Sequence, residues 1–264
     1  MTAIALTIAG SDSGGGAGIQ ADIKTFSALG TYAASVLTAI TAQNTKGVTA
    51  VEDISVPIIV AQMDAVFSDL DVNAVKIGMV SRSQTIQAIA ERLQHYQRKV
   101  VLDPVMVATS GDRLLQQDAI ETLREVLLPL ASIVTPNLPE AALLTGLPIA
   151  TDQAGKARQA ESILKAGASA VLIKGGHGSG PESTDILFDG NEMHAFTAPR
   201  IATTNDHGTG CTLAAAVTAH IAKGHSLTEA VQLSKDYLQK ALIASASLSV
   251  GHGRGPVHHF HGWW

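Results

Sequence analysis

The sequence predicts an α/β protein built on an open, mostly parallel sheet. Short apolar runs that end in glycine or polar residues alternate with longer stretches of helical periodicity up to about residue 175. This alternation is typical of β-α-β units, whose strands lie parallel. No Pro-rich, Ser-rich or like-charged linker interrupts the 264 residues, so we expect a single domain over residues 1–264.

The first unit is expected to be a strand, a glycine loop and a helix. Residues 3–9 are apolar and partly β-branched, residues 10–18 are rich in glycine, and residues 19–29 have helical periodicity. The glycines do not match G-x-G-x-x-G, because Ile19 stands where the third glycine belongs. No Walker A motif occurs either, since Gly155-Lys156 is followed by alanine. A bound nucleotide would need another phosphate cradle.

The middle of the chain repeats the pattern. Apolar, strand-like runs occupy residues 36–42, 73–77, Lys99–Leu102, 132–135 and 170–173. Helical periodicity covers residues 57–70, where Pro57 suits a first turn, then 83–95, 117–128 and 153–166, and another helix opens at Asn137.

The last third of the chain is expected to depart from the alternation of parallel strands and helices. Residues 185–188 and 193–197 flank Asp189-Gly190-Asn191, a turn signal that predicts an antiparallel hairpin. Two long helices, Thr209–Ala222 and 227–248, follow.

Composition excludes several classes of function. The chain has 18 Lys and Arg against 23 Asp and Glu without a basic cluster, which argues against a nucleic-acid partner. A basic leader is missing and no run of about 18 apolar residues occurs, so we expect a cytoplasmic protein without a membrane partner. The single cysteine, Cys211, excludes an internal disulfide and a cysteine zinc cluster.

Residues 203–211 (TTNDHGTGC) precede an apolar helical run and form a candidate anion site. Gly208 and Gly210 lack Cβ atoms that would keep a phosphate from the first-turn N–H groups and the positive end of the helix dipole. Cys211 lies at the helix start, where the pKa of a thiol tends to fall below about 8.5. A glycine turn into a helix also occurs where no ligand binds, so the rest of the chain must decide.

Polar residues at strand ends favour a ligand site. In open parallel sheets ligands bind beyond the carboxyl ends of the strands, and this rule predicts one rim for Gly10, Gln43, Met79, Asp103, Asn137 and Lys174. Lys174 is either a phosphate contact or a solvated lysine. Asn137 and Glu140 either supply oxygen ligands to Mg²⁺, directly or through water, or cap a helix, and both readings can hold together.

Other polar residues give weaker signals. His177, His207 and the His258-His259-His261 group lack the spacing of a metal motif. Asp12 is interpreted as a loop cap. The aromatic residues Phe260, Trp263 and Trp264 are expected to fold back on the body or to reach a partner subunit.

Seven motifs in order resemble a known family. They are GGGAGIQAD at 14–22, TAQNT at 41–45, KIGM at 76–79, DPVM at 103–106, TPNLPE at 135–140, KGGH at 174–177 and HGTGC at 207–211. Together they resemble the bacterial hydroxymethylpyrimidine/phosphomethylpyrimidine kinases of thiamine biosynthesis, members of the ribokinase-like superfamily. The resemblance implies a three-layer α/β/α fold with a mostly parallel central sheet and a short antiparallel hairpin.

The resemblance also implies roles for single residues. Cys211 would be the base for the hydroxymethyl proton, in an anion hole made by Gly208, Thr209 and Gly210. Lys174 would contact the transferring phosphate, and Thr209 would share in binding ATP. Asn137 and Glu140 would organise Mg²⁺ and phosphate, with Asp103 as a further ligand directly or through water. Gln43 and Asp22 would contact the aminopyrimidine, in a pocket lined by Gly10, Met79 and Val105.

The function expected from this resemblance is transfer of the γ-phosphoryl group of ATP, with Mg²⁺, to 4-amino-5-hydroxymethyl-2-methylpyrimidine and then to its monophosphate. A pyridoxal or pyridoxine kinase is the alternative enzyme. A non-catalytic pyrimidine or nucleotide sensor is a further alternative, disfavoured because Lys174, Asn137, Glu140 and Cys211 are all present. Adenine is expected near residues 198–204 and the last long helix, and a homodimer is left open.

Overall fold

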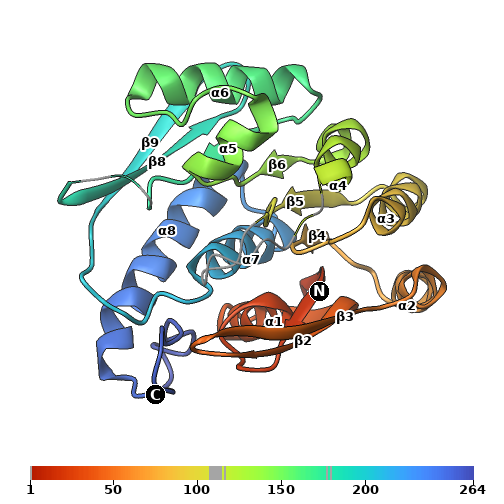
Figure 1. Cartoon of the computed structure of the whole chain (residues 1–264), viewed down its shortest axis with the longest axis horizontal. Helices are drawn as coiled ribbons and strands as arrows, with labels where there is room; N and C mark the ends of the chain where they lie inside the picture. Colours follow the sequence, from red (N-terminus) through yellow and green to blue (C-terminus); the bar gives the residue numbers. More distant parts are fainter. Residues whose placement is uncertain (1, 107–114, 116, 177, 179) are drawn as a thin grey trace.

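The computed structural model describes residues 2–106, 115, 117–176, 178 and 180–264. Its centre is a nine-stranded sheet in the order β3-β2-β1-β4-β5-β6-β7-β8-β9 (Figure 1). The strands are β1 (Ile4–Asp12), β2 (Tyr32–Asn44), β3 (Gly47–Asp53), β4 (Ala74–Ile77), β5 (Lys99–Leu102), β6 (Ile133–Val134), β7 (Val171–Ile173), β8 (Glu182–Phe188) and β9 (Met193–Pro199). The central strands from β2 to β7 are parallel, whereas β3, β8 and β9 pair antiparallel.

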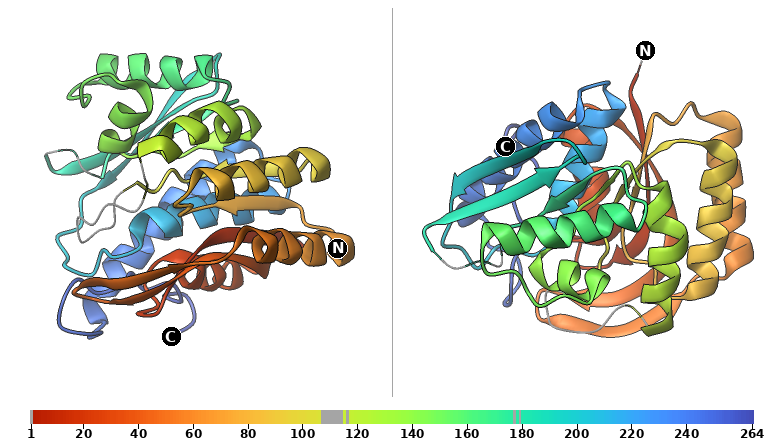
Figure 2. Two further views of the ribbon diagram at one scale, coloured as in Figure 1. Left: turned by 45° about the vertical axis from the view of Figure 1, so that its right-hand side comes forward. Right: turned by 90° about the horizontal axis from the view of Figure 1, so that it is seen from above.

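Helices cover both faces of this sheet. They are α1 (Gly18–Ala28), α2 (Val56–Asp69), α3 (Ser83–Tyr96), α4 (Gln117–Thr122), α5 (Leu138–Thr145), α6 (Gln153–Lys165), α7 (Thr209–Ala222) and α8 (Leu227–Ala244). Helices α1, α7 and α8 lie on one face and α2 to α6 on the other. In the right-hand view of Figure 2, α8 in blue lies on the side opposite to α2 and α3 in orange and yellow. The predicted three-layer α/β/α fold with a hairpin is therefore confirmed.

The alternation of side chains along the strands explains the two layers. In β5, Val100 and Leu102 join the apolar cluster under α2 to α6, while Val101 between them joins the cluster under α7 and α8. On the second face, Phe26 of α1 packs with Ala215 and Ala219 of α7. Small residues let α7 come close to both its neighbours and the sheet.

Several elements differ from the expected ones, and the last expected helix, 227–248, ends as α8 at Ala244. Strand β3 was not predicted, and it extends the sheet as an antiparallel partner of β2. The expected helix at 117–128 divides into α4, a π-helical turn at Leu123–Leu127 and a 3₁₀ turn at Leu128–Leu130. Pro129 is the physical reason, because its ring clashes with the carbonyl four residues earlier and it has no N–H to donate.

Strand β1 also runs further than expected, to Asp12, because Ser11 and Asp12 pair with Ile40 and Thr41 of β2. Because of this longer pairing, the carboxyl ends of β1 and β2 lie side by side up to Asp12 and Thr41. Among the described residues, no helix is both long and apolar enough to cross a bilayer.

Candidate active site

A cavity of about 670 Å³ lies at the carboxyl ends of the parallel strands. Its walls include nearly all the residues predicted to meet there: Gly10, Gln43, Met79, Asp103, Val105, Asn137, Glu140, Lys174, Gly208, Thr209, Gly210 and Cys211. Asp22 is the exception. The fold thus brings residues from six strands and from the start of α7 to one place.

Glycines shape the amino end of α7. Gly208 caps the helix with φ 79°, a left-handed conformation that favours glycine, and a Cβ there would overlap the carbonyl oxygen of Gly16. At Gly210 a Cβ would lie 3.4 Å from Nζ of Lys174. The two glycines therefore leave first-turn N–H groups open toward the cavity, next to a cationic side chain.

Lys174 lies between two buried carboxylates. Its Nζ is 2.7 Å from Oδ1 of Asp103 and 3.8 Å from Oε2 of Glu140. Burial lowers the pKa of the Lys174 ammonium, but the charges of Asp103 and Glu140 outweigh this effect and raise it to about 12. Lys174 is therefore not the solvated lysine of the alternative interpretation, and it stays cationic.

The Asn137 and Glu140 side chains form a capping box at the start of α5. Oδ1 of Asn137 accepts from the Glu140 N–H at 2.9 Å, and Oε2 of Glu140 accepts from the Asn137 N–H at 2.7 Å. Burial raises the pKa of the Glu140 carboxyl to about 7, with Asp103 adding to the effect and Lys174 opposing it. The shift is mainly an effect of desolvation, which the charge of Lys174 does not offset.

Cys211 does not have the acidic thiol expected from its position. Burial raises the pKa of the thiol to about 11, Lys76 opposes this shift, and Asp22 and Asp103 add to it. The N–H of Gly18 bonds to the sulfur and slightly favours the thiolate. Desolvation exceeds the opposing effects of Lys76 and Gly18, so the resting thiol is protonated at neutral pH.

The predicted contact between Asp22 and a ligand is wrong in this structure. Asp22 is completely buried outside the cavity wall, where Oδ2 accepts from Nζ of Lys76 at 2.8 Å and from the Thr7 hydroxyl at 2.6 Å. Lys76 itself lines the cavity. Asp22 therefore acts on the site through Lys76, whose pKa its charge helps to raise against the effect of burial.

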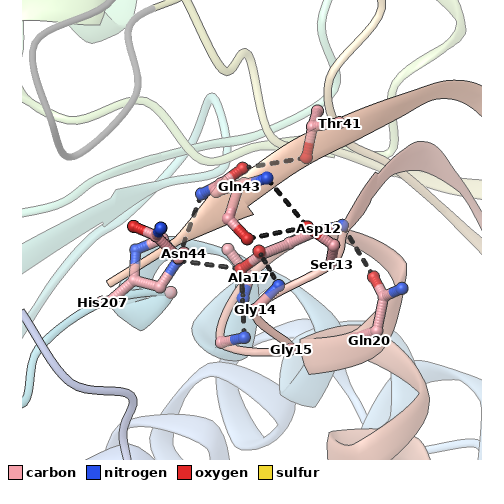
Figure 3. Close-up of polar contacts among 12 residues, drawn as sticks. Asp12, Ser13, Gly14, Gly15, Ala17, Gln20, Thr41, Gln43, Asn44 and His207 are labelled. Atoms are coloured by element: carbon pink, nitrogen blue, oxygen red, sulfur yellow. Dashed lines mark hydrogen bonds and ion pairs between the residues drawn. The ribbon is translucent and has the colours of Figure 1, made fainter. Parts of the chain in front are cut away.

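A polar network that the sequence analysis did not predict joins Asp12, His207 and Gln43 (Figure 3). Asp12 Oδ1 accepts from the N–H of Gly14, and Oδ2 from those of Gly16 and Ala17, so Asp12 caps the glycine loop as interpreted. In addition, His207 Nε2 lies 2.9 Å from Oδ2 of Asp12 and 3.3 Å from Nε2 of Gln43.

The far end of the cavity has the residues expected near adenine. Pro199, Ile201 and Thr203 line it together with Leu238 and Leu242 of α8. Beneath them, Nζ of Lys235 is 2.7 Å from Oδ2 of Asp185, a buried ion pair that ties α8 to β8.

The C-terminal segment folds back on the body beside the ends of β2 and β3 (Figure 1). The His207 N–H donates to the Gly255 carbonyl at 3.0 Å, and the Arg254 guanidinium pairs with Asp206. His259 is buried against Thr212, with 3.1 Å between Nε2 and Oγ1. Trp263 and Trp264 stay exposed.

His177 lies outside the described residues, and among those described no cluster of three His, Cys, Asp or Glu could hold a metal ion.

A mostly parallel sheet with a glycine-lined helix start, a buried lysine between carboxylates and a polar pocket in the same cavity is the arrangement of a small-molecule kinase of the ribokinase-like class. The family model described as phosphomethylpyrimidine kinase matches residues 12–258. The chain therefore belongs to the phosphomethylpyrimidine kinase family and is a phosphotransferase.

Individual relatives agree with this membership. A hydroxymethylpyrimidine/phosphomethylpyrimidine kinase of Rhizobium meliloti (strain 1021) is 67% identical over 264 residues, covering 100% of this chain and 99% of the relative. The phosphomethylpyrimidine kinase structure from Clostridium difficile 630 is 50% identical with a TM-score of 0.81, over 90% of this chain and 99% of that one. A Staphylococcus aureus pyridoxal kinase in complex with AMP-PCP and pyridoxal is 33% identical with a TM-score of 0.91, over 100% and 95%.

Proposed function

We propose that the chain phosphorylates 4-amino-5-hydroxymethyl-2-methylpyrimidine with ATP, and then the resulting monophosphate to the diphosphate, in thiamine biosynthesis. One observation carries this proposal. A single cavity is lined by the amino end of α7 with Lys174 and also by Gln43, Met79 and Val105, so a phosphate and a small polar ring can meet in it.

The anion loop and Lys174 neutralise the transferring phosphoryl group. The N–H groups of the first turn of α7, around Thr209 and Gly210, face developing negative charge without reorganising, and the ammonium of Lys174 adds a full positive charge. Asp103 holds that ammonium in place at 2.7 Å. These groups are also the contacts we propose for the phosphates of ATP.

The carboxylates near Lys174 fit Mg²⁺. Asp103 and Glu140 put two buried carboxylates beside one ammonium, and burial, with the charge of Asp103 adding to it, raises the pKa of Glu140 despite the opposing charge of Lys174. Carboxylate and amide oxygens are the ligands that Mg²⁺ prefers. We propose that Glu140, Asn137 and Asp103 hold the ion directly or through water, where it neutralises phosphate charge.

Cys211 is the proposed base for the hydroxymethyl proton of the first acceptor. Its thiol lines the cavity, and the nearby ammonium of Lys76 favours the thiolate that must form before the sulfur can take a proton. In the second step the acceptor is already a phosphate anion, which needs no strong base.

Gln43 is the proposed partner of the ring. An aminopyrimidine offers a donor amine next to an acceptor nitrogen, and a side-chain amide has one group of each kind. Met79 and Val105 supply apolar walls, and Gly10 leaves room for Met79, because a Cβ there would lie 2.7 Å from Met79 Cε.

We also propose a position for adenine, a cellular compartment and the partners of the chain. Adenine would lie between Pro199, Ile201 and Thr203 and the α8 side chains Leu238 and Leu242. We propose a cytoplasmic enzyme without a nucleic-acid partner, and a homodimer that involves the exposed Trp263 and Trp264 stays a prediction.

An assay of ATP consumption with three acceptors in parallel tests the proposal: the aminopyrimidine alcohol, its monophosphate and pyridoxal. We expect turnover of both pyrimidines, and loss of both in Lys174→Met, which excludes a contaminating kinase. Absence of turnover with either pyrimidine would overturn the proposal. A preference for pyridoxal would instead favour the alternative that the resemblance to the pyridoxal kinase structure supports.

A further inference from the structure

The side-chain amide of Gln43 is held on both sides. The amide oxygen Oε1 lies 3.2 Å from the hydroxyl oxygen of Thr41, and the amide nitrogen Nε2 lies 3.3 Å from Nε2 of His207 (Figure 3). An amide that rotates freely can exchange its oxygen and its NH₂ group at no cost, so it does not distinguish a donor from an acceptor. Its two neighbours therefore decide what Gln43 offers to a ring.

The Thr41 hydroxyl has one proton, and that proton is already used. Oγ1 of Thr41 lies 2.8 Å from the carbonyl oxygen of Ser11, which can only accept. Toward Gln43 the same oxygen is therefore an acceptor, and the amide must turn its NH₂ group to Thr41.

His207 requires the same orientation. Its Nε2 lies 2.9 Å from Oδ2 of Asp12, so this nitrogen must carry a proton if Asp12 is ionised. Burial raises the pKa of the Asp12 carboxyl, but the bonds from His207 and from the N–H groups of Ala17 and Gly14 outweigh burial and bring the pKa below its usual value. Asp12 is therefore a carboxylate, and Nε2 of His207 carries one proton that lies between Asp12 and Gln43. A protonated Nε2 has no lone pair to accept from an NH₂ group, so the amide oxygen of Gln43 fits this side and can share the proton.

Both sides thus agree on one orientation, which is the reverse of the one in Figure 3; the two ends of a side-chain amide have the same shape and are assigned from their hydrogen-bond partners. We propose that Asp12, His207 and Thr41 fix the Gln43 amide with its oxygen toward His207 and its NH₂ group toward Thr41, and so make the cavity selective for a ring that pairs a donor amine with an acceptor nitrogen. This inference rests on the proposed function and names three positioning residues for it.

The fixed amide keeps one free lone pair on its oxygen and one free N–H for the ring. A 4-aminopyrimidine satisfies both, since its amine donates to the oxygen and its N3 accepts from the N–H. In the 4-oxo analogue, 5-hydroxymethyl-2-methylpyrimidin-4(3H)-one, the donor and the acceptor are exchanged. A fixed amide mismatches this analogue at both positions, while a free amide would turn over and accept it.

The close packing of His207 keeps this arrangement rigid. A Cβ on Gly16 would lie 3.3 Å from Nε2 of the ring and closer still to Cδ2, so the glycine loop packs directly on His207. The side chain of His207 is 12% exposed and that of Asp12 3%. The residue that orients Gln43 is also the neighbour of Gly208 in the anion loop.

The test is the ratio of kcat/KM for the 4-amino alcohol to that for its 4-oxo analogue. In the unaltered protein we expect a ratio of about 100 or more, because a mismatched analogue leaves buried polar groups unpaired. Thr41→Val keeps the shape of the side chain and removes the acceptor, and His207→Leu removes the donor. Each should lower the ratio by about tenfold or more, mainly by lowering KM for the 4-oxo analogue, because a freed amide can turn over and pair with it.

Thr49→Val is the matched control. Its hydroxyl also bonds a backbone carbonyl of β2, that of Ala42 at 2.9 Å, but does not touch the Gln43 amide. We expect it to leave the ratio unchanged. If the unaltered protein phosphorylates the 4-amino alcohol, and Thr41→Val and His207→Leu keep its ratio as the control does, the orientation proposal is overturned while the proposed function stands. If the unaltered protein phosphorylates neither ring, the proposed function fails.

A second measurement does not depend on activity. The ¹⁵N NMR shifts of the His207 imidazole should show that Nε2 carries a proton in the free protein. In Asp12→Asn an amide replaces the carboxylate, and the hydrogen bond from this N–H to residue 12 should be lost. A ring protonated on Nδ1 alone in the unaltered protein would overturn the proposed orientation.

Discussion

Two opposite influences act on Cys211, and their balance decides how the thiol can react. The start of α7 and the ammonium of Lys76 favour a thiolate, while desolvation and the carboxylates of Asp22 and Asp103 favour the thiol. The result is a pKa of about 11. A base of this kind is strong once it is formed but is formed rarely at neutral pH.

This balance predicts different pH dependences for the two phosphorylations. Turnover of the alcohol should rise between about pH 7 and pH 9, because the thiolate fraction rises with pH, while turnover of the monophosphate should change less. Cys211→Ala should lower the first reaction by about 100-fold or more and the second much less. Separate assays of the two acceptors measure this, and equal losses would count against Cys211 as the base.

Glu140 gives a prediction about stability. Its pKa of about 7 lies above the ordinary value of 4.5, so folding favours the protonated form. The contribution of this carboxyl to stability is complete below pH 4.5 and is lost as pH rises through 7. Without Mg²⁺, Glu140→Gln should therefore be more stable than the unaltered protein at pH 8, by on the order of 1–3 kcal/mol, and about equally stable at pH 4.

Denaturant unfolding at the two pH values measures this difference. Glu161→Gln, an exposed change on α6, is the matched control and should have no effect at either pH. A Glu140→Gln variant that is destabilised at pH 8 would show that the charge of Glu140 is compensated in the folded protein.

The sequence predicted the catalytic half of the site better than the ring-binding half. Lys174, Asn137 and Glu140 follow strands and sit in a recognisable motif, so their meeting could be expected from the fold. The loop cap at Asp12 was predicted, but its contact with His207 and the burial of Asp22 away from the cavity were not. The different roles of Asp22 and Asp12 depend on Lys76 and His207, which are 54 and 195 residues away along the chain.

At the scale of elements, the sequence predicts buried strands and amphipathic helices well and edges poorly. Strand β3 is an edge strand with mostly exposed side chains and lacks a continuous apolar run, so only its pairing with β2 identifies it. The π-helical turn before Pro129 keeps the helical apolar pattern, and periodicity alone cannot distinguish it from an α-helix.

Helix α7 offers a matched pair of substitutions at its two ends. Gly208 precedes the helix with φ 79° and Gly224 follows it with φ 90°, but only a Cβ at Gly208 meets another atom, the carbonyl oxygen of Gly16. Gly224→Ala should cost about 1 kcal/mol from backbone strain alone. Gly208→Ala should cost more and should weaken ADP binding by about tenfold or more, because the loop must move away from the phosphates.

Thermal unfolding and calorimetric titration with ADP measure both effects. If the two variants bind ADP equally well, the anion loop of α7 does not hold the nucleotide.

At the scale of the whole molecule, one continuous sheet passes under both groups of helices. We propose on this basis that residues 1–264 form a single domain. Unfolding in denaturant should then give one transition with the same midpoint by circular dichroism and by tryptophan fluorescence, which reports Trp263 and Trp264 at the end of the chain. ADP at about 100 times its Kd should stabilise both signals together by about 2.7 kcal/mol. Two separate midpoints would contradict a single domain.

The backbone contact between His207 and Gly255 has a consequence for protein synthesis. The loop that contains Asp206 and His207 is completed by residues made some fifty positions later, through the Gly255 carbonyl and the Arg254 side chain. A growing chain on the ribosome can form the sheet and α7 while these residues are still inside the exit tunnel. It cannot bind nucleotide in its final geometry until they emerge, so we expect nucleotide binding to follow the synthesis of residues 254 and 255.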